Sequence, residues 1–142
     1  RNEGVAGQER LVLFGASTGS AAALGVAADM PDAVWAVMSR GGRVDLAPTD
    51  LAQVRAPTLL IVGGADRDTL RLNVGSIARL GGPVTLRVVR GAGHVFEEPG
   101  ALGRVGELAA RWLGRQERRA RLRGGLRSLF GRSATGSAPA AT

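Results

Sequence analysis

Cysteine and lysine are absent from the 142-residue chain, and there is a single histidine, His94. Without cysteine the chain can form neither disulfide bonds nor a thiol nucleophile, and one histidine is too few for the Cys/His clusters that hold structural zinc. The absence of lysine excludes the phosphate-binding loop that ends in Gly-Lys-Ser/Thr. That exclusion removes a large class of nucleotide hydrolases.

Long apolar runs are also missing, since none approaches the roughly 20 residues that a membrane-spanning helix needs. No secretion signal is recognisable either, so we expect a soluble, cytoplasmic protein. The chain is 44% hydrophobic and 22% charged, which is typical of one globular domain with a core. Because it begins with Arg1 and enters an apolar strand almost at once, we expect it to be a piece of a longer protein.

The net charge of +7 is concentrated at the carboxyl end. Residues 115–142 hold seven arginines and one glutamate, a balance of +6, which leaves only +1 for residues 1–114. We therefore predict a domain over 1–114 and a tail over 115–142, helical at first and disordered from Ser133. A solvated extension is the favoured interpretation of the tail. The alternative is a basic amphipathic helix, weakened by three glycines, that binds nucleic acid or an anionic membrane.

Apolar runs alternate with helical patterns along the first 114 residues. Strands are predicted over 11–14, 33–38, 58–62 and 84–89, and helices over 20–28, 70–80 with Thr69 as its cap, and from about 101 with an apolar stripe of Leu102, Val105, Leu108, Ala109, Trp112 and Leu113. For the helix over 70–80, Leu72, Ile77 and Leu80 are the predicted buried face. The fourth strand alternates apolar and polar residues, which places it nearer the sheet edge. This order predicts an α/β fold with a mostly parallel sheet and flanking helices, whose ligand site lies at the carboxyl ends of the strands.

Gly15-Ala16-Ser17-Thr18-Gly19 connects the first predicted strand to the first predicted helix. In this context Gly-x-Ser-x-Gly is the pattern of a nucleophile elbow, a tight turn that projects the serine hydroxyl above the sheet. We expect glycine at 15 and at 19 because side chains there would collide with the neighbouring elements. The amide of Thr18 is the predicted oxyanion donor. Taken alone, the pentapeptide could also be a turn that needs small residues only for packing.

A serine hydroxyl needs an imidazole to take its proton, and the imidazole needs a carboxylate to orient it. His94 follows the last predicted strand, and Asp66 follows the strand before it. The order Ser17, Asp66, His94 is that of α/β hydrolases, and all three lie at strand carboxyl ends. We predict that they form a catalytic triad, which requires no metal and no organic cofactor. Asp68 is the alternative acid, and a lone loop histidine or an aspartate after two glycines can also be purely structural.

Four segments together resemble the dienelactone hydrolase-like α/β hydrolases. They are the Gly15–Gly19 elbow, Ser39-Arg40-Gly41-Gly42, the run from Ala56-Pro57-Thr58 to Ala65-Asp66, and Gly93-His94-Val95-Phe96-Glu97-Glu98-Pro99-Gly100. The resemblance covers about residues 10–114. Within the group, this sequence is similar to domains found alone or fused behind a phosphoribosyltransferase domain. The resemblance implies a hydrolase whose substrate is generally undefined, and an upstream domain on the full-length chain. The substrate that we expect is a small ester-like molecule.

Two departures from that group shape the expectation. The resemblance implies a cysteine nucleophile in dienelactone hydrolases proper, whereas this chain has Ser17 at that position. We therefore expect esterase-like cleavage of an ester- or lactone-like bond through an acyl-serine intermediate. The family fold also implies strands before the elbow and a loop that donates a second oxyanion N–H, and neither precedes Arg10. We therefore expect the carboxy-terminal half of an α/β-hydrolase fold, with the amino-terminal strands missing. The alternatives are a non-catalytic remnant and a module that binds through its Arg-rich tail.

Three further charged residues lie near the predicted site. Arg40, at the end of the second predicted strand, could bind a carboxylate or phosphate of the substrate, but a surface ion pair is the favoured interpretation. Glu97 and Glu98 follow His94 and precede a helix, where acidic residues ordinarily act as caps and dipole partners.

Overall fold

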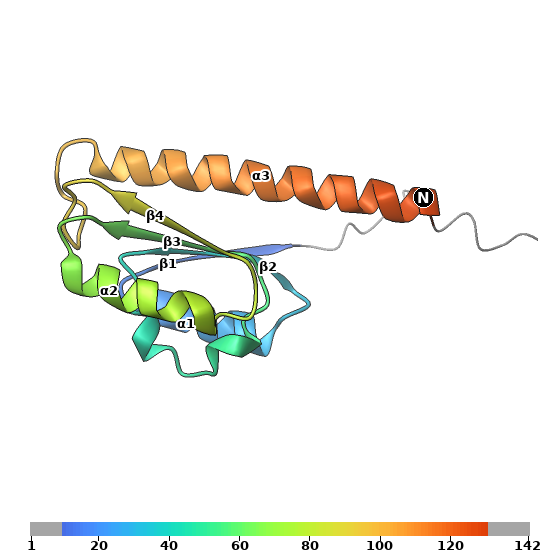
Figure 1. Cartoon of the computed structure of the whole chain (residues 1–142), viewed down its shortest axis with the longest axis horizontal. Coiled ribbons are helices and arrows are strands. Elements are labelled where there is room, and N and C mark those ends of the chain that lie inside the picture. The colour runs from blue at the N-terminus through green and yellow to red at the C-terminus, as the bar shows by residue number, and fades with distance from the viewer. Residues whose placement is uncertain (1–9, 131–142) are drawn as a thin grey trace, which may run out of the picture. The chain divides into compact units, whose positions relative to one another are not determined.

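The computed structural model describes residues 10–130, and its sheet has four parallel strands in the order β1-β2-β3-β4 (Figure 1). The strands are β1 (Leu11–Ala16), β2 (Val34–Arg40), β3 (Thr58–Gly63) and β4 (Val84–Val89). Because each strand pairs with the next one along the chain, every crossover moves one position in the same direction across the sheet. The predicted α/β class with a parallel sheet is confirmed, and β4 is an edge strand as expected.

Helices connect the strands and cover the sheet. They are α1 (Thr18–Asp29), α2 (Arg67–Ser76) and α3 (Ala101–Phe130), with short 3-10 turns η1 (Val44–Leu46), η2 (Leu51–Gln53) and η3 (Ile77–Arg79). Helices α1 and α2 lie on one face of the sheet, and the first turns of α3, up to Ala109, lie on the other (Figure 1). One compact unit ends at Ala109 and a second begins at Ala110. Helix α3 is continuous past residue 114, where we predicted the domain to end, and residues 131–142 of the predicted tail lie outside the described residues.

The core lies between the sheet and α1 and α2. Leu24 of α1, Val37 of β2 and Leu60 of β3 are completely buried there. Every residue of β3 is buried, as expected for a strand with neighbours on both sides and helices on both faces. The edge strand β1 is only partly covered, and Phe14 remains 51% exposed.

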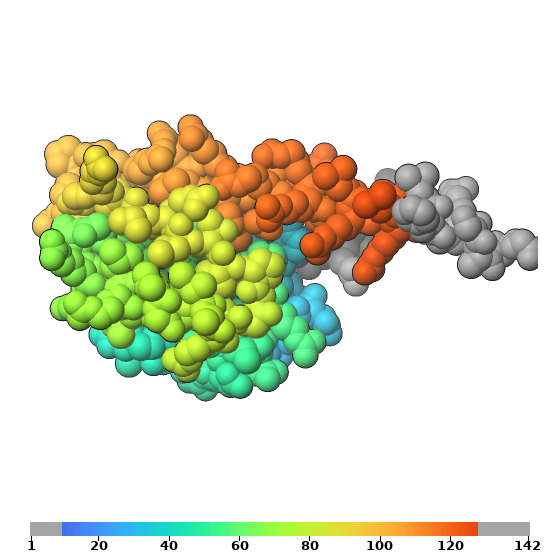
Figure 2. Space-filling view, viewed as in Figure 1, coloured from blue at the N-terminus to red at the C-terminus, as the bar shows by residue number. Residues whose placement is uncertain are grey.

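Helix α2 differs from its prediction in both its bounds and its buried face. It begins at Arg67 and its N-cap is Asp66, so Thr69 lies inside the first turn instead of capping it. Leu72, predicted to be buried, is 37% exposed on the outward side of the helix, which forms part of the surface seen in Figure 2. The helix ends at Ser76, and its buried residues are Thr69, Asn73 and Ser76. The face of α2 that turns inward is therefore polar. Asn73 on this face donates a hydrogen bond to the carbonyl of Gly42, in the loop after β2. Beyond the end of the helix, Leu80 is buried as predicted and Ile77 packs against the core.

The remaining elements follow the predictions closely, with extended ends. Strands β1, β2 and β3 run one or two residues further than the apolar runs, because hydrogen bonding to a neighbour continues where apolar side chains stop. In α3 the predicted stripe is partly wrong: Val105 and Leu108 are buried, but Leu102 is 56% exposed. No helix within residues 10–130 is long and apolar enough to cross a membrane.

Candidate active site

The turn from β1 to α1 holds Ser17 in a backbone conformation that L-residues rarely adopt, with φ 50° and ψ −120°. Three backbone hydrogen bonds fix this conformation. The Ser17 N–H donates to the carbonyl of Arg40 at 3.1 Å, and the Ser17 carbonyl accepts from Ser20 and Arg43 at 3.1 and 3.0 Å. A non-glycine residue persists in such a conformation only when its surroundings impose it, and these residues are often functional.

The two glycines that flank Ser17 play different parts. A Cβ at Gly15 would lie 2.6 Å from the backbone oxygen of Gly19 and from the Cα of Ser20, closer than real side chains approach. A Cβ at Gly19 would meet nothing within 4 Å, so the expectation that both glycines relieve collisions is wrong for Gly19. Only the glycine before the serine is needed sterically, because α1 turns back over the end of β1 at that point.

The structure brings Ser17, His94 and Asp66 together. Ser17 Oγ lies 3.1 Å from His94 Nε2, and His94 Nδ1 lies 2.7 Å from Asp66 Oδ2. An ionised carboxylate only accepts hydrogen bonds, so Nδ1 carries the ring proton and its N–H donates a hydrogen bond to Asp66 Oδ2. Nε2 is then free to accept the hydrogen bond of the Ser17 hydroxyl. The His94 side chain is 41% exposed, and that of Asp66 is 14% exposed.

Asp66 uses both of its carboxylate oxygens. While Oδ2 binds His94, Oδ1 accepts the Thr69 N–H at 3.3 Å and caps α2. Burial raises the pKa of Asp66, but the hydrogen bonds from Thr69 and His94 together outweigh it and leave the pKa below its ordinary value. The group is therefore a carboxylate at neutral pH. Structural capping and contact with the histidine, which the sequence presented as alternatives, occur in the same side chain.

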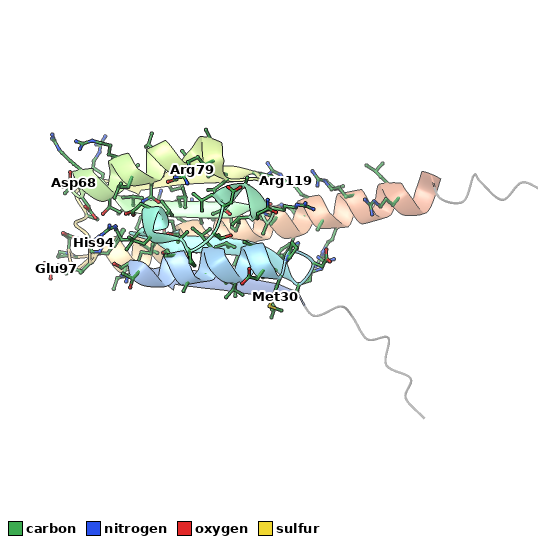
Figure 3. All side chains as sticks on the ribbon, turned by 90° about the horizontal axis from the view of Figure 1, so that it is seen from below. Met30, Asp68, Arg79, His94, Glu97 and Arg119 are labelled. Carbon is green, nitrogen blue, oxygen red and sulfur yellow. The ribbon has the colours of Figure 1, made fainter. Side chains whose placement is uncertain are left out.

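The alternative acid, Asp68, is not part of this arrangement. Its side chain is 91% exposed and lies 3.6 Å from Arg71. Figure 3 shows Asp68, His94 and Glu97 at the same end of the sheet, with Met30 at the opposite end. An acidic residue at this end of the sheet is thus not necessarily within reach of the imidazole. Asp66, the nearer of the two aspartates to the end of β3, contacts His94, and Asp68 does not.

The loops that carry Asp66 and His94 are joined through their backbones. Gly64 N–H donates to the Val89 carbonyl at 2.8 Å, and Ala65 N–H donates to the Ala92 carbonyl at 3.0 Å. A Cβ on Gly63 would fall on the Ala92 carbonyl oxygen, so this close approach requires glycine. Hydrogen bonds of the β3–β4 ladder thereby continue into the loops and fix the separation of the acid and the histidine.

Arg40 and Glu98 hold the His94 loop, which we define as residues 93–98. The guanidinium of Arg40 lies 5.5 Å from the centre of the Phe96 ring and donates to the Val95 carbonyl at 3.4 Å. Among residues 10–130 Arg40 contacts no carboxylate, so the favoured interpretation, a surface ion pair, is not borne out within the part of the chain that the structure describes. On the other side, Glu98 Oε1 accepts the Gly93 N–H at 2.8 Å, and the Glu98 carbonyl accepts the first amide of α3 at 3.0 Å.

Glu98 also lines a cavity of about 390 Å³ that includes no triad residue. Arg90 and Arg104 line the same cavity, and Glu98 Oε2 is buried with no hydrogen-bond partner among residues 10–130. Glu97 is exposed. Of the two acidic residues after His94, only Glu98 contacts the backbone of the loop, so its position suits support of the loop rather than contact with a substrate.

Sequence reasoning missed a buried polar layer beneath the elbow. Ser39 donates to Ser20 at 2.8 Å, and both side chains are fully buried. Asn73, also fully buried, donates to the carbonyls of Gly42 and Thr69 at 2.9 and 2.8 Å. This links the loop after β2 to the helix that carries Asp66 at its N-cap. The three- and four-residue spacing of Thr69, Asn73 and Ser76 was the available signal, but a polar stripe reads as a solvated face.

The predicted oxyanion donor, Thr18, is the first residue of α1. N–H groups in the first turn of a helix have no acceptor within that helix. The Thr18 amide is adjacent to the Ser17 hydroxyl along the chain. Its role as an oxyanion donor stays a prediction.

No family model matches this chain, but it is similar to known proteins both in sequence and in structure. Two proteins of Mycobacterium tuberculosis, from strains CDC 1551 / Oshkosh and H37Rv and both provisionally named phosphoribosyl transferases, are 57% identical over 99 residues, which are 70% of this chain and 22% of each relative. A crystal structure of dienelactone hydrolase from Anabaena variabilis matches with a TM-score of 0.70 and 50% sequence identity, over 73% of this chain and 48% of that one.

The chain therefore spans about a fifth of the length of these curated relatives and about half of the solved structure. The expected resemblance to dienelactone hydrolase-like α/β hydrolases is confirmed, and the four-stranded sheet is a partial α/β-hydrolase fold. The names of the two mycobacterial relatives agree with the expected relationship to proteins that contain a phosphoribosyltransferase.

Proposed function

We propose that this chain supplies the nucleophile, base and orienting acid of a serine hydrolase that cleaves an ester- or lactone-like bond through an acyl-serine intermediate. The observation that carries the proposal is the continuous hydrogen-bonded series from Ser17 Oγ to His94 Nε2, and from His94 Nδ1 to Asp66 Oδ2. The similarity to dienelactone hydrolase supports the same class of reaction.

In the acylation step, Ser17 Oγ attacks the carbonyl carbon of the ester while His94 Nε2 takes the hydroxyl proton. Asp66, held as a carboxylate, stabilises the resulting imidazolium through Nδ1–H. The carbonyl oxygen becomes an oxyanion, and the Thr18 N–H is the donor nearest to it along the chain. When the tetrahedral intermediate collapses, the bond to the leaving alcohol breaks, and His94 returns its proton to the departing oxygen.

In the deacylation step, water replaces the alcohol. His94 removes a proton from the water, the resulting hydroxide attacks the acyl carbon, and the bond to Ser17 Oγ breaks as the proton returns to the serine. The products are a carboxylic acid and the original hydroxyl group. For a lactone the leaving oxygen stays attached to the acyl group, so hydrolysis opens the ring and gives one product.

Labelling with a fluorophosphonate probe tests the proposal, because the probe reacts with activated serines and not with ordinary hydroxyls. We expect the chain to be labelled, and Ser17→Ala and His94→Gln to abolish the labelling. The matched control is Ser76→Ala, which removes a serine whose hydroxyl bonds to the Leu72 carbonyl. In a parallel assay with p-nitrophenyl acetate, Ser17→Ala should lower kcat by about 10⁴-fold or more. Absence of labelling in a chain shown to be folded by circular dichroism would count against the proposal.

A further inference from the structure

The second compact unit contains the arginine-rich part of α3, which we call the basic helix and define as residues 110–127. From residue 115 onward it has six arginines and one glutamate, a net charge of +5. Among the described residues, none of these six guanidinium groups forms an ion pair. The helix is therefore a concentrated positive charge that the described part of the chain does not neutralise.

Local sequence alone does little to stabilise this helix. Arg115, Arg119, Arg123 and Arg127 follow one another at four-residue steps, and like charges at that spacing repel one another on a helix. Gly114, Gly124 and Gly125 lie in its interior, where glycine is unfavourable. A partner that carries negative charge would remove the repulsion, so the helix gains stability from binding one.

The basic helix also exposes apolar side chains. Leu122 is 69% exposed and Leu126 is 53% exposed, and they lie one turn apart on the same side of the helix. At about 100° per residue, Arg119 and Arg123 each lie within about 60° of Leu126 around the helix axis. Arg119 and Arg123 thus lie on the leucine side of the helix and not opposite it. At a membrane interface this is possible, because the long apolar stem of arginine can lie along the lipid while the guanidinium reaches the headgroups.

We infer that the basic helix docks on an anionic lipid surface, with Leu122 and Leu126 entering the acyl boundary and the arginines contacting the headgroups. Arginine suits this position because its long apolar stem can lie along the lipid while the guanidinium stays at the headgroup level. Attachment of this kind leaves the helix on the surface, which is consistent with the lack of a spanning helix among residues 10–130.

Two other occupants fit the helix less well. Nucleic acid would neutralise the arginines but would leave both leucines in water, because phosphate contacts use only the charged groups. A second copy of the chain could bury the leucines, but it would bring a charge of +5 against another +5. An anionic lipid surface satisfies the charge and the apolar side chains at once.

Co-sedimentation of the full 142-residue chain with lipid vesicles tests the inference. The probes are vesicles of phosphatidylcholine alone and vesicles with about 30% phosphatidylserine. Because each basic residue near an anionic surface contributes on the order of a fivefold change in affinity, we expect Arg119→Gln/Arg123→Gln/Arg127→Gln to weaken binding to the anionic vesicles by about 100-fold. Leu122→Ser/Leu126→Ser should weaken it by at least about tenfold.

Two matched controls remove the same groups from the first unit. Arg67→Gln/Arg71→Gln/Arg79→Gln removes three exposed charges, and Leu46→Ser/Leu102→Ser removes two leucines that are 51% and 56% exposed. Both should leave vesicle binding within about threefold of the original, which is the scale of a change in net charge alone.

Four outcomes overturn the inference. They are equal binding to both kinds of vesicle, anionic binding that the leucine substitutions do not weaken, binding to duplex DNA without binding to vesicles, and a dimer in light scattering that the leucine substitutions dissociate. None of these measurements requires hydrolase activity, so the result is independent of the proposed function.

Discussion

At the scale of single residues, one side chain can serve the stability of an element and the chemistry of a site together. Asp66 caps α2 with one oxygen and holds His94 with the other, whereas Asp68, two residues away, contacts only solvent and Arg71. The first oxygen fixes the carboxylate relative to the helix, and this leaves the second one aimed at the imidazole. Proximity in sequence between two acidic residues therefore says little about which of them is used.

Asp66→Asn tests this assignment. An amide cannot stabilise the imidazolium as a carboxylate does and favours the wrong ring tautomer, so we expect kcat to fall by about 10⁴-fold while the far-ultraviolet circular dichroism spectrum stays unchanged. Asp68→Asn is the matched control and should leave kcat within about twofold. A larger loss from Asp68→Asn than from Asp66→Asn, in the same p-nitrophenyl acetate assay, would reverse the assignment.

A second test at this scale asks whether Arg40 holds the loop that carries His94. His94 is the single histidine of the chain, so its imidazole signals in an NMR spectrum can be assigned without ambiguity. We expect the Nδ1–H proton of His94, bound to Asp66 at 2.7 Å, to appear as a downfield resonance in the proton NMR spectrum. Arg40→Met removes the contacts to Val95 and Phe96 and should broaden or abolish that resonance. Arg87→Met, which loses only a contact to the neighbouring Leu86 carbonyl, should preserve it. An unchanged resonance in Arg40→Met would show that the arginine does not hold the loop.

At the scale of elements, the turn between β1 and α1 shows how packing selects glycine at one position of a motif and not at another. Gly15 lies against the backbone of Gly19 and Ser20, whereas Gly19 faces open space in the first turn of α1. Of the two glycines in the Gly-x-Ser-x-Gly motif, only Gly15 is therefore required for steric reasons.

Gly15→Ala and Gly19→Ala should therefore differ in sign. Gly15→Ala forces the elbow apart, and we expect it to lower the free energy of unfolding by about 1–3 kcal/mol. Gly19→Ala adds a methyl group without contacts in a helix, where alanine is better by up to about 1 kcal/mol, so the free energy of unfolding should stay equal or rise. Urea unfolding followed by circular dichroism measures both values. A loss of more than about 1 kcal/mol in Gly19→Ala would mean that the turn is tighter than its geometry indicates.

At the scale of the whole molecule, the site depends on the order of the strands. Ser17, Asp66 and His94 follow β1, β3 and β4, and Arg40 at the end of β2 lies between the serine and the acid in the sheet. Because all four strands are parallel, these residues reach the same edge, and backbone hydrogen bonds between the loops set their spacing. The exposed side of β1, where Phe14 is 51% exposed, lies next to the elbow.

The lowered pKa of Asp66 makes the stability of the whole molecule depend on pH. An aspartate has a pKa of about 3.9 in an unfolded chain, and that of Asp66 is lower in the fold. Between these two pKa values the unfolded state binds more protons than the folded state. The contribution of Asp66 to the free energy of unfolding is therefore complete above the pKa of the unfolded state, and it is lost as the pH falls through the pKa of the folded state. We expect the free energy of unfolding of the original chain to exceed that of Asp66→Asn at pH 7.

This difference should shrink as the pH falls below about 4, and urea unfolding at several pH values between 7 and 3 measures it. Asp45 also has a lowered pKa, through its hydrogen bond to Arg43, but it contributes to both proteins and cancels in the comparison. A difference that stays constant down to pH 3 would contradict the assigned interactions of Asp66.

The sequence by itself determined the parallel α/β class, the approximate bounds of the strands and the candidate triad. Two of its apolar runs, 11–14 and 58–62, end directly before a glycine, and the other two predicted strands end within three residues of one. In a parallel sheet the residues after each strand reach the same edge. Ser17, Asp66 and His94 were named on that ground, and the structure brings their side chains within hydrogen-bond distance.

Only the tertiary structure decided what the polar residues between these elements contact. It chose Asp66 over Asp68 as the partner of His94, and it gave Arg40 an aromatic ring and a carbonyl instead of a carboxylate. It also buried Asn73 of α2 and left Leu72, predicted to be buried, exposed. The spacing of apolar residues predicts the buried face of a helix or strand where that face packs through apolar side chains. Hydrogen bonds between distant loops depend on distances and angles set by the whole sheet, and no local pattern encodes them.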